Sequence, residues 1–385
     1  YCANCMPKKV ISHFVGLSGI GGVQSNFIEY MNNLELHPSK YHHKVYTIGD
    51  IDSYYRLSSD VLNIRKISNL YRLVLDIVSR DVIVHFYNNL SSSKVALFLA
   101  LLPVSKLIVH ERGTIWNQKS SSWLIPRFIA WKASVILSNS VATKTMLEKK
   151  ISISTEKIRV LHNGINTSLN CGYCDVRKNN NSVFIIGFIG RLDSPKGVHV
   201  LIDSMNYLAN KNIELIIAGE GVLESMLKKS ASKLNNVKFI GRVDNPYSFI
   251  STIDLLVVPS IREPLGNVCL EAGLCKTPVL AANIDGIPEI IEDCVSGELI
   301  DPTGDITMDF PFNAVPLPEF VVDPVTYEIH TPLQINPKKL ADKILELSLE
   351  EEILTGYSEQ LHKRVVDYFN IDRYALELHR IYQGM

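Results

Sequence analysis

A loop in the second half of the chain places two cations between glycines. The run GRLDSPKG, residues 190–197, follows an apolar stretch and sets Arg191 and Lys196 five positions apart. Cationic groups beside the start of a helix are suited to bind a diphosphate, or to offset the charge on a departing phosphate. The alternative is that both are ordinary solvated cations of the surface.

Two carboxylates flank a second glycine-containing run, EPLGNVCLE, residues 263–271. Glu263 is predicted on the loop after a strand, and Glu271 within the helix that follows. Because a carboxylate accepts hydrogen bonds from two hydroxyl groups, each is suited to bind a sugar diol. A glutamate buried in an apolar helix without a partner is uncommon. The alternative is one surface glutamate and one structural glutamate.

A glycine-rich run in the first half, GIGGV at 19–23, lies between a predicted strand and a predicted helix. Gly21 and Gly22 would let the backbone approach a ligand, and the helix N-terminus offers free amide groups to a phosphate or a sugar. The run differs from the dinucleotide-binding pattern, because no acidic residue is convincingly placed at the end of the second strand. A tight turn that requires positive φ is the alternative.

Four motifs together resemble glycosyltransferase family 4, a large retaining family with the GT-B fold that includes enzymes of bacterial polysaccharide synthesis. They are HNGI (162–165), GRLDSPKG (190–197), GEG (219–221) and EPLGNVCLE (263–271). The resemblance is clearest over residues 158–300 and weaker over 9–150. One motif alone would be modest support, whereas four in order and at sensible distances are not expected by chance.

The resemblance implies a role for each polar residue of these motifs. Arg191 and Lys196 would hold the diphosphate of a nucleotide-sugar donor, Glu263 would bind the donor sugar, and Glu271 would bind the ribose hydroxyls. The base would stack near residues 241–243. The implied donor-binding set is Gly21, Gly22, Arg191, Lys196, Gly219, Arg242, Val243, Glu263, Leu265, Gly266, Asn267, Val268 and Glu271.

His110 completes the implied catalytic set of Arg191, Lys196, His110 and Glu263. It lies in the run VHERG at 109–113, where the family often has a histidine directed into the cleft. There it would contact the donor sugar or the reacting centre. A structural hydrogen bond of a strand-end histidine is the alternative, and the neighbouring residues 111 and 112 could instead pair with each other.

The implied function is that of a retaining hexosyltransferase that moves a sugar from a UDP- or GDP-sugar to a glycan or lipid-linked glycan. Surface polysaccharide or lipopolysaccharide synthesis is the implied context. No D-x-D metal signature accompanies the motifs, so we expect no essential metal and no cofactor besides the substrate. The alternatives are an epimerase or phosphorylase of the same fold, or a non-catalytic protein that binds sugar nucleotides. The base, the sugar, the acceptor, the linkage and the oligomeric state are not predicted.

The elements that would position these residues alternate between short apolar strands and amphipathic helices, as in a doubly wound parallel sheet. The alternation runs twice, which predicts two Rossmann-like α/β domains that face each other across a cleft. We expect the first domain at 6–166, a linker rich in Asn, Gly and Cys at 167–182, and the second domain at 183–368. The last helix, within 369–385, is expected to pack back on the first domain. The proline-rich stretch 301–336 is either a β-hairpin or an acceptor-side loop.

The cysteines allow a second kind of site. Cys2 with Cys5, and Cys171 with Cys174, form two C-x-x-C pairs that could together hold zinc, although free thiols are favoured because so many residues separate the pairs. The other three cysteines, at 269, 275 and 294, lie in apolar surroundings and are predicted in the core.

The composition of the chain limits which classes of partner are expected. The chain has 39 basic and 40 acidic side chains, so there is no global basic field to hold a nucleic acid. No apolar stretch reaches the roughly 20 residues of a membrane span, and no apolar signal segment is evident, so a cytoplasmic location is expected. Peripheral contact with the inner face of the cytoplasmic membrane stays open. The candidate surfaces are Trp116, Trp123, Arg127, Trp131 and Lys132, or the helix around Arg65, Lys66 and Arg72. The alternative for the first set is core packing, with the cations extending to solvent.

Overall fold

The computed structural model describes residues 9–19, 21–37, 39–170 and 183–385. It divides the chain into two compact units. Unit 1 contains residues up to 165 together with 371–385, and unit 2 contains 166–370. The predicted linker, 167–182, falls mostly outside the described residues.

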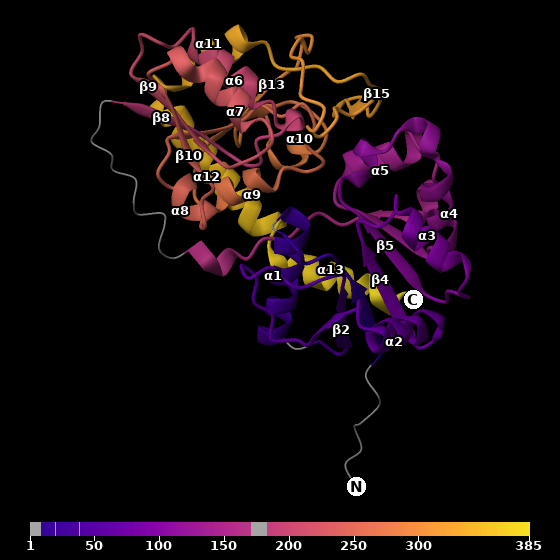
Figure 1. Cartoon of the computed structure of the whole chain (residues 1–385). Coiled ribbons are helices and arrows are strands. Elements are labelled where there is room, and N and C mark those ends of the chain that lie inside the picture. The colour runs from indigo at the N-terminus through magenta and orange to yellow at the C-terminus, as the bar shows by residue number, and fades with distance from the viewer. Residues whose placement is uncertain (1–8, 20, 38, 171–182) are drawn as a thin grey trace. The chain divides into compact units, whose positions relative to one another are not determined.

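Unit 1 is built on a seven-stranded parallel sheet with the order β3-β2-β1-β4-β5-β6-β7 (Figure 1). Its strands are β1 (Val10–Phe14), β2 (His42–Thr47), β3 (Val61–Asn63), β4 (Val82–Tyr87), β5 (Leu107–Glu111), β6 (Val135–Ser138) and β7 (Ile158–Val160). Its helices are α1 (Gly22–Leu36), α2 (Ile67–Val78), α3 (Ser93–Ala100), α4 (Leu124–Lys132), α5 (Val141–Lys149) and α13 (Ile371–Gln383).

Unit 2 contains a six-stranded parallel sheet with the order β10-β9-β8-β11-β12-β13. Its strands are β8 (Phe184–Ile189), β9 (Ile213–Ala218), β10 (Val237–Gly241), β11 (Leu255–Val258), β12 (Val279–Ala282) and β13 (Glu298–Ile300). Its helices are α6 (Val198–Met205), α7 (Glu224–Ser230), α8 (Pro246–Ile250), α9 (Asn267–Leu274), α10 (Ile287–Ile290), α11 (Pro337–Leu347) and α12 (Glu351–Tyr368).

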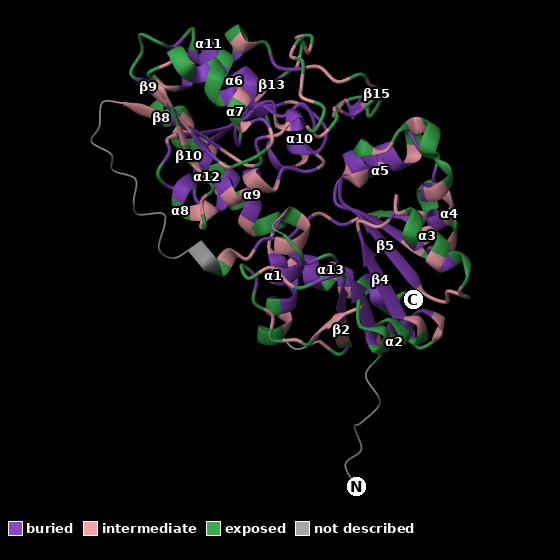
Figure 2. Ribbon diagram, in the orientation of Figure 1, coloured by how far each residue is buried: buried purple, intermediate pink, exposed green. Residues whose placement is uncertain are grey.

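The central strands of both sheets are buried on both faces (Figure 2). Strands such as β4, VIVHFY, and β11, LLVV, therefore appear in the sequence as short continuous apolar runs, which is typical of strands covered by helices on both sides. The predicted alternation of strands and helices is confirmed, most elements matching to within a few residues.

The C-terminal helix α13 completes the core of unit 1. It packs against α1, and its buried face includes Tyr374, Leu378 and Tyr382. The hydroxyl of Tyr382 hydrogen-bonds Nδ1 of His85 on β4 at 2.7 Å, which ties α13 to the sheet. Segments far apart in the chain thus form one hydrophobic core.

The stretch 301–336 contains a small hairpin, formed by β14 (Val321–Val322) and β15 (Ile329–His330) in antiparallel pairing. The rest of this stretch has no regular helix or strand beyond an isolated bridge between Gly304 and Gln334. None of the described helices combines the length and the apolar character that a membrane crossing requires.

Candidate functional site

Four loops of unit 2 meet at the carboxyl edge of its sheet. They follow β8, β9, β10 and β11, which are neighbours in the order β10-β9-β8-β11 and run parallel. Because parallel strands end at the same edge, the runs 190–197, 219–221 and 259–263 and the end of β10 are brought together. Such an edge is where open α/β sheets bind ligands.

The loops after β8 and β11 are joined through their backbones. The amides of Ile261 and Arg262 both donate to the carbonyl of Pro195, at 2.9 and 3.2 Å. Gly197 lies where only glycine fits, because its φ is +64° and a Cβ there would lie 2.0 Å from the carbonyl oxygen of Pro259. The close approach of the two loops brings Lys196 near the residues that follow β11.

Lys196 and Glu263 form an ion pair at this edge. Lys196 Nζ donates to Glu263 Oε2 at 2.6 Å, and Ser260 Oγ donates to the same oxygen at 3.2 Å. The glutamate side chain is 9% exposed and the lysine 26% exposed, so both remain within reach of a ligand that enters from solvent. Two residues that lie far apart in the sequence therefore share one site.

Asp285, which the sequence analysis did not single out, fixes the backbone of Glu263. Its Oδ2 accepts the amide of Glu263 at 2.9 Å, while the amide of Gly286 donates to the Glu263 carbonyl at 3.1 Å. Asp285 is buried after β12 and has a φ of 48°, a conformation that Asp and Asn adopt more readily than most residues. The Asp-Gly pair directly after an apolar run was the available signal for this turn.

The helix α9 carries the second glutamate of the motif. It begins after Gly266, whose φ is 97°, and no side chain caps its first turn. Asn267 is in that first turn, and Glu271 follows four residues later on the same face. Glu271 is half-buried rather than buried as predicted, because this face of the helix is turned partly toward solvent. The N-terminus of α9 thus presents backbone amides on the same loop as Glu263.

Burial and the negative charge of Glu263 raise the pKa of Cys269, a buried thiol of α9. This thiol therefore stays protonated at neutral pH and is not a nucleophile. Cys269 and Cys275 are buried as predicted, whereas the prediction that Cys294 lies in the core is wrong. Cys294 is exposed in a turn before β13, where its φ is 58°.

The remaining predicted donor residues surround these loops. Gly219 touches Gly190, where a Cβ on Gly219 would lie 1.9 Å from the Gly190 carbonyl oxygen, and the amide of Gly219 donates to the Gly241 carbonyl at 2.7 Å. Arg242 is exposed and Val243 half-buried just after β10. Leu265 is buried and Val268 half-buried beside Gly266.

Arg191 and Arg262, two arginines near this edge, differ in burial. Arg191 is exposed, whereas Arg262 is buried, and sequence analysis did not identify the latter. Burial lowers the pKa of Arg262, Glu263 and Asp285 raise it, and Arg191 lowers it further. Arg191 therefore lies close enough to act electrostatically on this group, although Lys196 alone of the predicted cation pair contacts Glu263.

The stretch 301–336 is attached to the candidate site at two points. The amide of Val315 donates to Asp193 Oδ1 at 3.0 Å, and the Val315 carbonyl accepts the Ser194 hydroxyl. The amide of Val322 donates to Asp285 Oδ1 at 2.7 Å. Both Asp193 and Asp285 belong to loops of the carboxyl edge, so the hairpin and its flanks border the same site.

In unit 1, Gly21 and Gly22 begin α1 as predicted. Gly21 is the residue before the first helical turn, in extended conformation with a φ of −174°, and its amide donates to the hydroxyl of Tyr55 at 3.3 Å. No side chain caps this turn. The positive φ in the run belongs to Gly19, at +99°, so the tight-turn alternative describes Gly19 rather than the two glycines that start the helix.

His110 is buried on β5, and neither ring nitrogen has a hydrogen-bond partner among the described residues. Its ring stacks on His85 at a centroid distance of 5.5 Å and an interplanar angle of 13°. Burial, then the charge of Arg112, holds the pKa of His110 well below its ordinary value. The imidazole is therefore neutral near pH 7, and no described residue satisfies its two nitrogens.

Glu111 and Arg112 do not pair with each other, which was one alternative. Glu111 accepts the amides of Gly113 and Ile115, at 2.9 and 3.0 Å. Arg112 instead donates to the side chains of Asn26 and Asn163 and fastens α1 to the segment after β7. These two charged residues next to His110 are thus engaged within unit 1.

The cysteines proposed for zinc, Cys2, Cys5, Cys171 and Cys174, lie outside the described residues. Within the described part of the chain, one group of three side chains has metal-ligand spacing: Asp293, Cys294 and Glu298. The Glu298 carboxylate is already bound by Lys343 Nζ and the Tyr357 hydroxyl, each at 2.8 Å. No described contact links this group to the loops of the candidate site.

Comparison with known proteins agrees with this geometry. Residues 175–308, less than half of the chain, match the family model "Glycosyl transferases group 1". The matched segment contains all four loops described above. It also includes both partners of the ion pair formed by Lys196 and Glu263.

Two characterised relatives are similar over part of their length. A capsular polysaccharide biosynthesis glycosyltransferase, CapM of Staphylococcus aureus, is 33% identical over 141 residues, which cover 35% of each chain. A Campylobacter jejuni N-acetylgalactosaminyltransferase named for a diphospho-undecaprenol acceptor is 27% identical over 215 residues, 53% of this chain and 58% of the relative. The chain therefore spans between about a third and three fifths of these relatives.

The likeness to solved structures extends over nearly the whole chain. The crystal structure of Anabaena Alr3699/HepE in complex with UDP-glucose superimposes with a TM-score of 0.74, over 98% of this chain and 100% of that chain, at 17% identity. At this identity the likeness concerns the fold. The predicted α/β GT-B fold with two Rossmann-like domains is confirmed.

Proposed function

We propose that this chain is a retaining glycosyltransferase that moves a hexose-type sugar from a nucleotide-sugar donor, UDP- or GDP-linked, to a glycan or lipid-linked glycan. The observation that supports this best is the Lys196–Glu263 pair at 2.6 Å. It lies on glycine-backed loops inside the segment that matches glycosyl transferases group 1. Surface polysaccharide synthesis is the proposed context, since relatives are named for capsular polysaccharide and for a lipid-diphosphate acceptor.

In this proposal the donor diphosphate binds Lys196 and Arg191 at the N-terminus of α9, near the amides of Gly266 and Asn267. Lys196 would exchange part of its contact with Glu263 for phosphate oxygens, while Glu263 binds the sugar hydroxyls. Glu271 would bind the ribose, and the base would lie at Gly219, Arg242 and Val243. A cation beside the departing phosphate stabilises the charge that forms there.

Unit 1 contributes His110, Gly21 and Gly22 to the proposed reaction. Both ring nitrogens of His110 are buried and lack a hydrogen-bond partner among the described residues, and the proposal assigns hydroxyl groups of the donor sugar to them. As the resemblance implies, the amides that begin α1 would bind a donor phosphate. A neutral imidazole binds hydroxyls as donor and acceptor, whereas an imidazolium would compete electrostatically with Lys196 for the diphosphate.

The proposed chemistry keeps the anomeric configuration. The acceptor oxygen attacks the anomeric carbon on the face from which the diphosphate leaves, through an oxocarbenium-like state. The bond from that carbon to the phosphate oxygen breaks, and the leaving phosphate takes the acceptor proton. No residue of the set needs to form a covalent intermediate, and we expect activity to persist in excess chelator.

The test has two readouts because the acceptor is unknown. A panel of UDP-, GDP-, ADP- and dTDP-sugars is screened for thermal stabilisation, and the stabilising donors are then assayed for release of free nucleotide. We expect one donor class to bind and to be hydrolysed slowly. Binding without release over long incubation would favour the alternative of a non-catalytic sugar-nucleotide-binding protein. If no donor in the panel binds and none is hydrolysed, the proposal is refuted.

A further inference from the structure

Three helices of unit 1 lie side by side on one face of its sheet. Because β3–α2–β4, β4–α3–β5 and β5–α4–β6 all advance across the sheet in the same direction, right-handed crossovers place α2, α3 and α4 on the same face. The helices α1 and α13, which pack against each other, cover the opposite face (Figure 1).

The helix α2 has apolar side chains on its outer side as well as on its buried side. It buries Leu73 and Ile77 together with the polar Asn69 and Asp76. Ile67, Tyr71 and Leu75 are nevertheless exposed, Ile67 by 84%. A helix that only covered a sheet would be polar on its outer side, so these exposed apolar side chains have no role in the core of unit 1.

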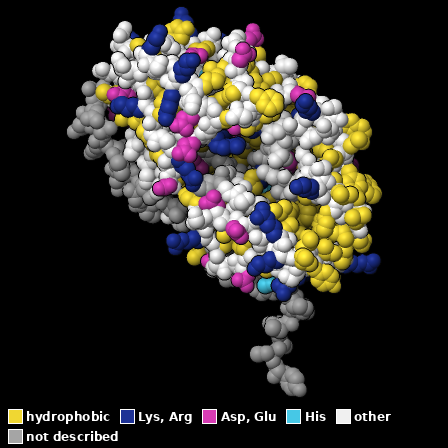
Figure 3. All heavy atoms as spheres, viewed as in Figure 1, with side chains coloured by type: hydrophobic (Ala, Val, Ile, Leu, Met, Phe, Trp, Pro, Cys, Tyr) yellow, Lys and Arg dark blue, Asp and Glu magenta, His cyan; other side chains and the backbone are white. Residues whose placement is uncertain are grey.

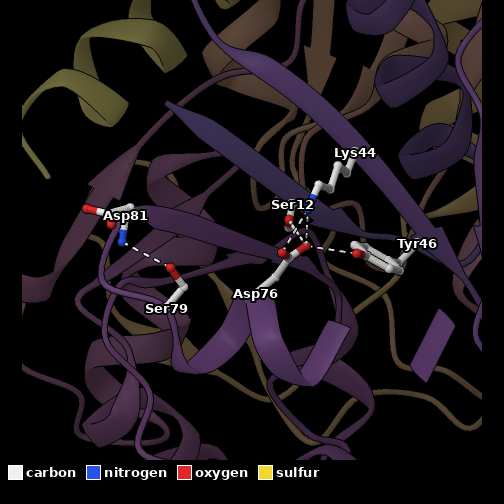
Figure 4. Close-up of polar contacts among 6 residues, drawn as sticks. All are labelled: Ser12, Lys44, Tyr46, Asp76, Ser79 and Asp81. Carbon is white, nitrogen blue, oxygen red and sulfur yellow. Dashed lines mark hydrogen bonds and ion pairs between the residues drawn. The ribbon is translucent and has the colours of Figure 1, made fainter. Parts of the chain in front are cut away.

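A hydrogen-bonded network holds α2 in this orientation (Figure 4). The Asp76 carboxylate accepts from Ser12 Oγ at 2.6 Å, from Tyr46 hydroxyl at 2.8 Å and from Lys44 Nζ at 2.9 Å. These three partners come from β1 and β2. A buried carboxylate without these partners would strongly destabilise the fold. The helix α2 therefore keeps Asp76 on its buried side, and its outer apolar side chains stay exposed.

The same surface continues over α3 and α4. Leu97 and Leu101 at the end of α3 are exposed, and Trp123, Leu124 and Trp131 are exposed around α4. The helices are joined where Lys132 Nζ donates to the Leu102 carbonyl at 3.3 Å. Figure 3 shows hydrophobic side chains gathered over this part of unit 1. Trp116, which the sequence grouped with this surface, is buried in the turn before α4 and does not belong to it.

Cations surround the exposed apolar side chains. The Arg127 guanidinium lies 4.6 Å from the ring of Trp123, and Lys132 Nζ lies 5.5 Å from the ring of Trp131. Between residues 65 and 132, the exposed or half-buried charged groups are nine cations and one acid, Asp81. The cations are Arg65, Lys66, Arg72, Arg80, Lys94, Lys106, Lys119, Arg127 and Lys132. The net charge of the whole chain is −1, so this excess is local.

We propose that the outer surface of α2, α3 and α4 docks on a bilayer that contains anionic phospholipids. Leucine, isoleucine and tryptophan side chains enter the boundary between headgroups and acyl chains, and the cations bind the phosphates. Charge complementarity favours this occupant over a second copy of the chain. Two copies joined by the same surface would place one ring of cations against another.

Docking goes beyond the proposed function and is tested without it, because binding to vesicles is measured rather than turnover. The full chain is sedimented with vesicles of phosphatidylcholine alone, and with vesicles containing about 30 mol% phosphatidylglycerol. We expect binding to the anionic vesicles and little to the neutral ones, with release at roughly 0.5 M salt as exposed charges are screened. Equal binding to both vesicles, or none to either, would overturn the proposal.

Matched variants assign the binding to this surface. The double variant Leu97→Ser with Trp131→Ser removes exposed apolar groups. We expect its partition coefficient between vesicles and water to fall at least about tenfold. Lys66→Gln with Lys94→Gln should reduce the preference for anionic vesicles. The control, Leu36→Ser with Leu376→Ser, removes exposed leucines from α1 and α13 and should bind like the parent.

Sedimentation equilibrium in the absence of lipid tests whether a second copy of the chain, and not a bilayer, covers this surface. If the parent dimerises without vesicles and the Leu97→Ser, Trp131→Ser variant does not, the surface joins two copies and the proposal is wrong. A parent that stays monomeric and binds vesicles through these residues supports it. If the control variant lost binding as well, the effect would not belong to this surface, and the proposal would also fail.

Discussion

Lys196 is the residue on which the proposed chemistry depends most directly. Its ammonium is the one predicted cation in contact with a site carboxylate, Glu263. If it stabilises the leaving diphosphate, Lys196→Ala should lower turnover by on the order of 10²-fold. The measurement is steady-state release of nucleotide from the donor identified by thermal screening. Lys211→Ala, an exposed lysine of the same unit, is the control.

The same substitution leaves the Glu263 carboxylate without its ammonium partner, so loss of fold must be separated from loss of chemistry. Far-UV circular dichroism and the melting temperature of Lys196→Ala are therefore compared with the parent. A variant that melts like the parent and turns over at parental rates would exclude Lys196 from the reaction.

Asp285 positions Glu263 rather than touching a substrate. Its two carboxylate oxygens accept two different amides, from Glu263 and from Val322. Asp285→Asn keeps the shape but turns one acceptor into a donor that faces an amide, at a cost of roughly 1–3 kcal/mol. We expect lower unfolding free energy and weaker donor binding, measured by urea titration and by the donor's Michaelis constant.

A control for Asp285 is available on the neighbouring hairpin. Asp323 also accepts two amides, from Val325 and Thr326, but it does not contact the loop of Glu263. Asp323→Asn should therefore leave the Michaelis constant for the donor unchanged. If both variants change it equally, Asp285 acts through the hairpin and not through Glu263.

At this scale the sequence predicts residues that carry charge in recognisable runs, and misses those that act through the backbone. The pairing of Lys196 with Glu263 follows from two motifs at ends of neighbouring strands. Asp285 and Arg262 were not identified, because an Asp-Gly pair indicates a turn but not which amides the carboxylate accepts, and a buried guanidinium has no local signature. Burial of Trp116 agrees with the core-packing alternative for its stripe, whereas Trp123 and Trp131 are exposed.

The elements around the site depend on loops that approach closely. Gly197 stands between a short turn and α6, with positive φ and its α-carbon against the Pro259 carbonyl. Gly197→Ala would add both backbone strain and a steric clash, and should lower the unfolding free energy by about 2–4 kcal/mol. It should also separate the two loops that bring Lys196 to Glu263, so donor binding should fall with stability.

Gly356 provides the opposite case for the same chemical change. It lies exposed within α12, and a Cβ there meets nothing within 4 Å. Gly356→Ala should therefore raise the unfolding free energy by roughly 0.5–1 kcal/mol. The unfolding free energies of Gly197→Ala and Gly356→Ala are measured by urea unfolding followed by circular dichroism. Equal effects of the two substitutions would mean that the close contact of Gly197 is not rigid.

The periodicity of the sequence predicts most helices and strands because each must bury an apolar side. It fails where that rule does not hold. The strand β3 has only three residues, all half-buried, and gives no apolar run. The stretch 301–336 is held by a few scattered hydrogen bonds, such as those to Asp193 and Asp285, rather than by periodic packing. The helix α2 is apolar on two sides, and the sequence pattern does not show that the side with Asp76 is the buried one.

For the chain as a whole, the sequence predicts that the last helix packs back on the first domain, although its apolar face alone would suit either sheet. Its place is decided by specific contacts. Tyr30 hydroxyl lies 3.1 Å from His379 Nε2, and Asn33 donates to Asp372 at 2.7 Å. These contacts join α1 to α13 and close a core in unit 1 that is rich in histidine and tyrosine.

That core makes unit 1 sensitive to acid. Burial is the main cause that lowers the pKa values of His13, His85, His110 and His379. Nearby cations and other histidines add to this effect, such as His43, whose Nδ1 lies 2.9 Å from His13 Nε2. In the unfolded chain these groups would titrate near their ordinary value of about 6.5.

We therefore expect the stability of unit 1 to be full above about pH 6.5 and to fall as the pH drops toward the lower pKa values of the folded state. Each such histidine contributes up to about 1.4 kcal/mol per pH unit. The raised pKa of Glu111 opposes this trend only where that carboxyl titrates. All three tryptophans, at 116, 123 and 131, lie in unit 1, so their fluorescence reports its unfolding alone. The urea midpoint of the parent should fall between pH 7.5 and pH 5.5, and that of His85→Phe should fall less. The control is His42→Gln, which replaces an exposed histidine and should behave like the parent. A midpoint independent of pH would show that the buried histidines are not excluded from protons.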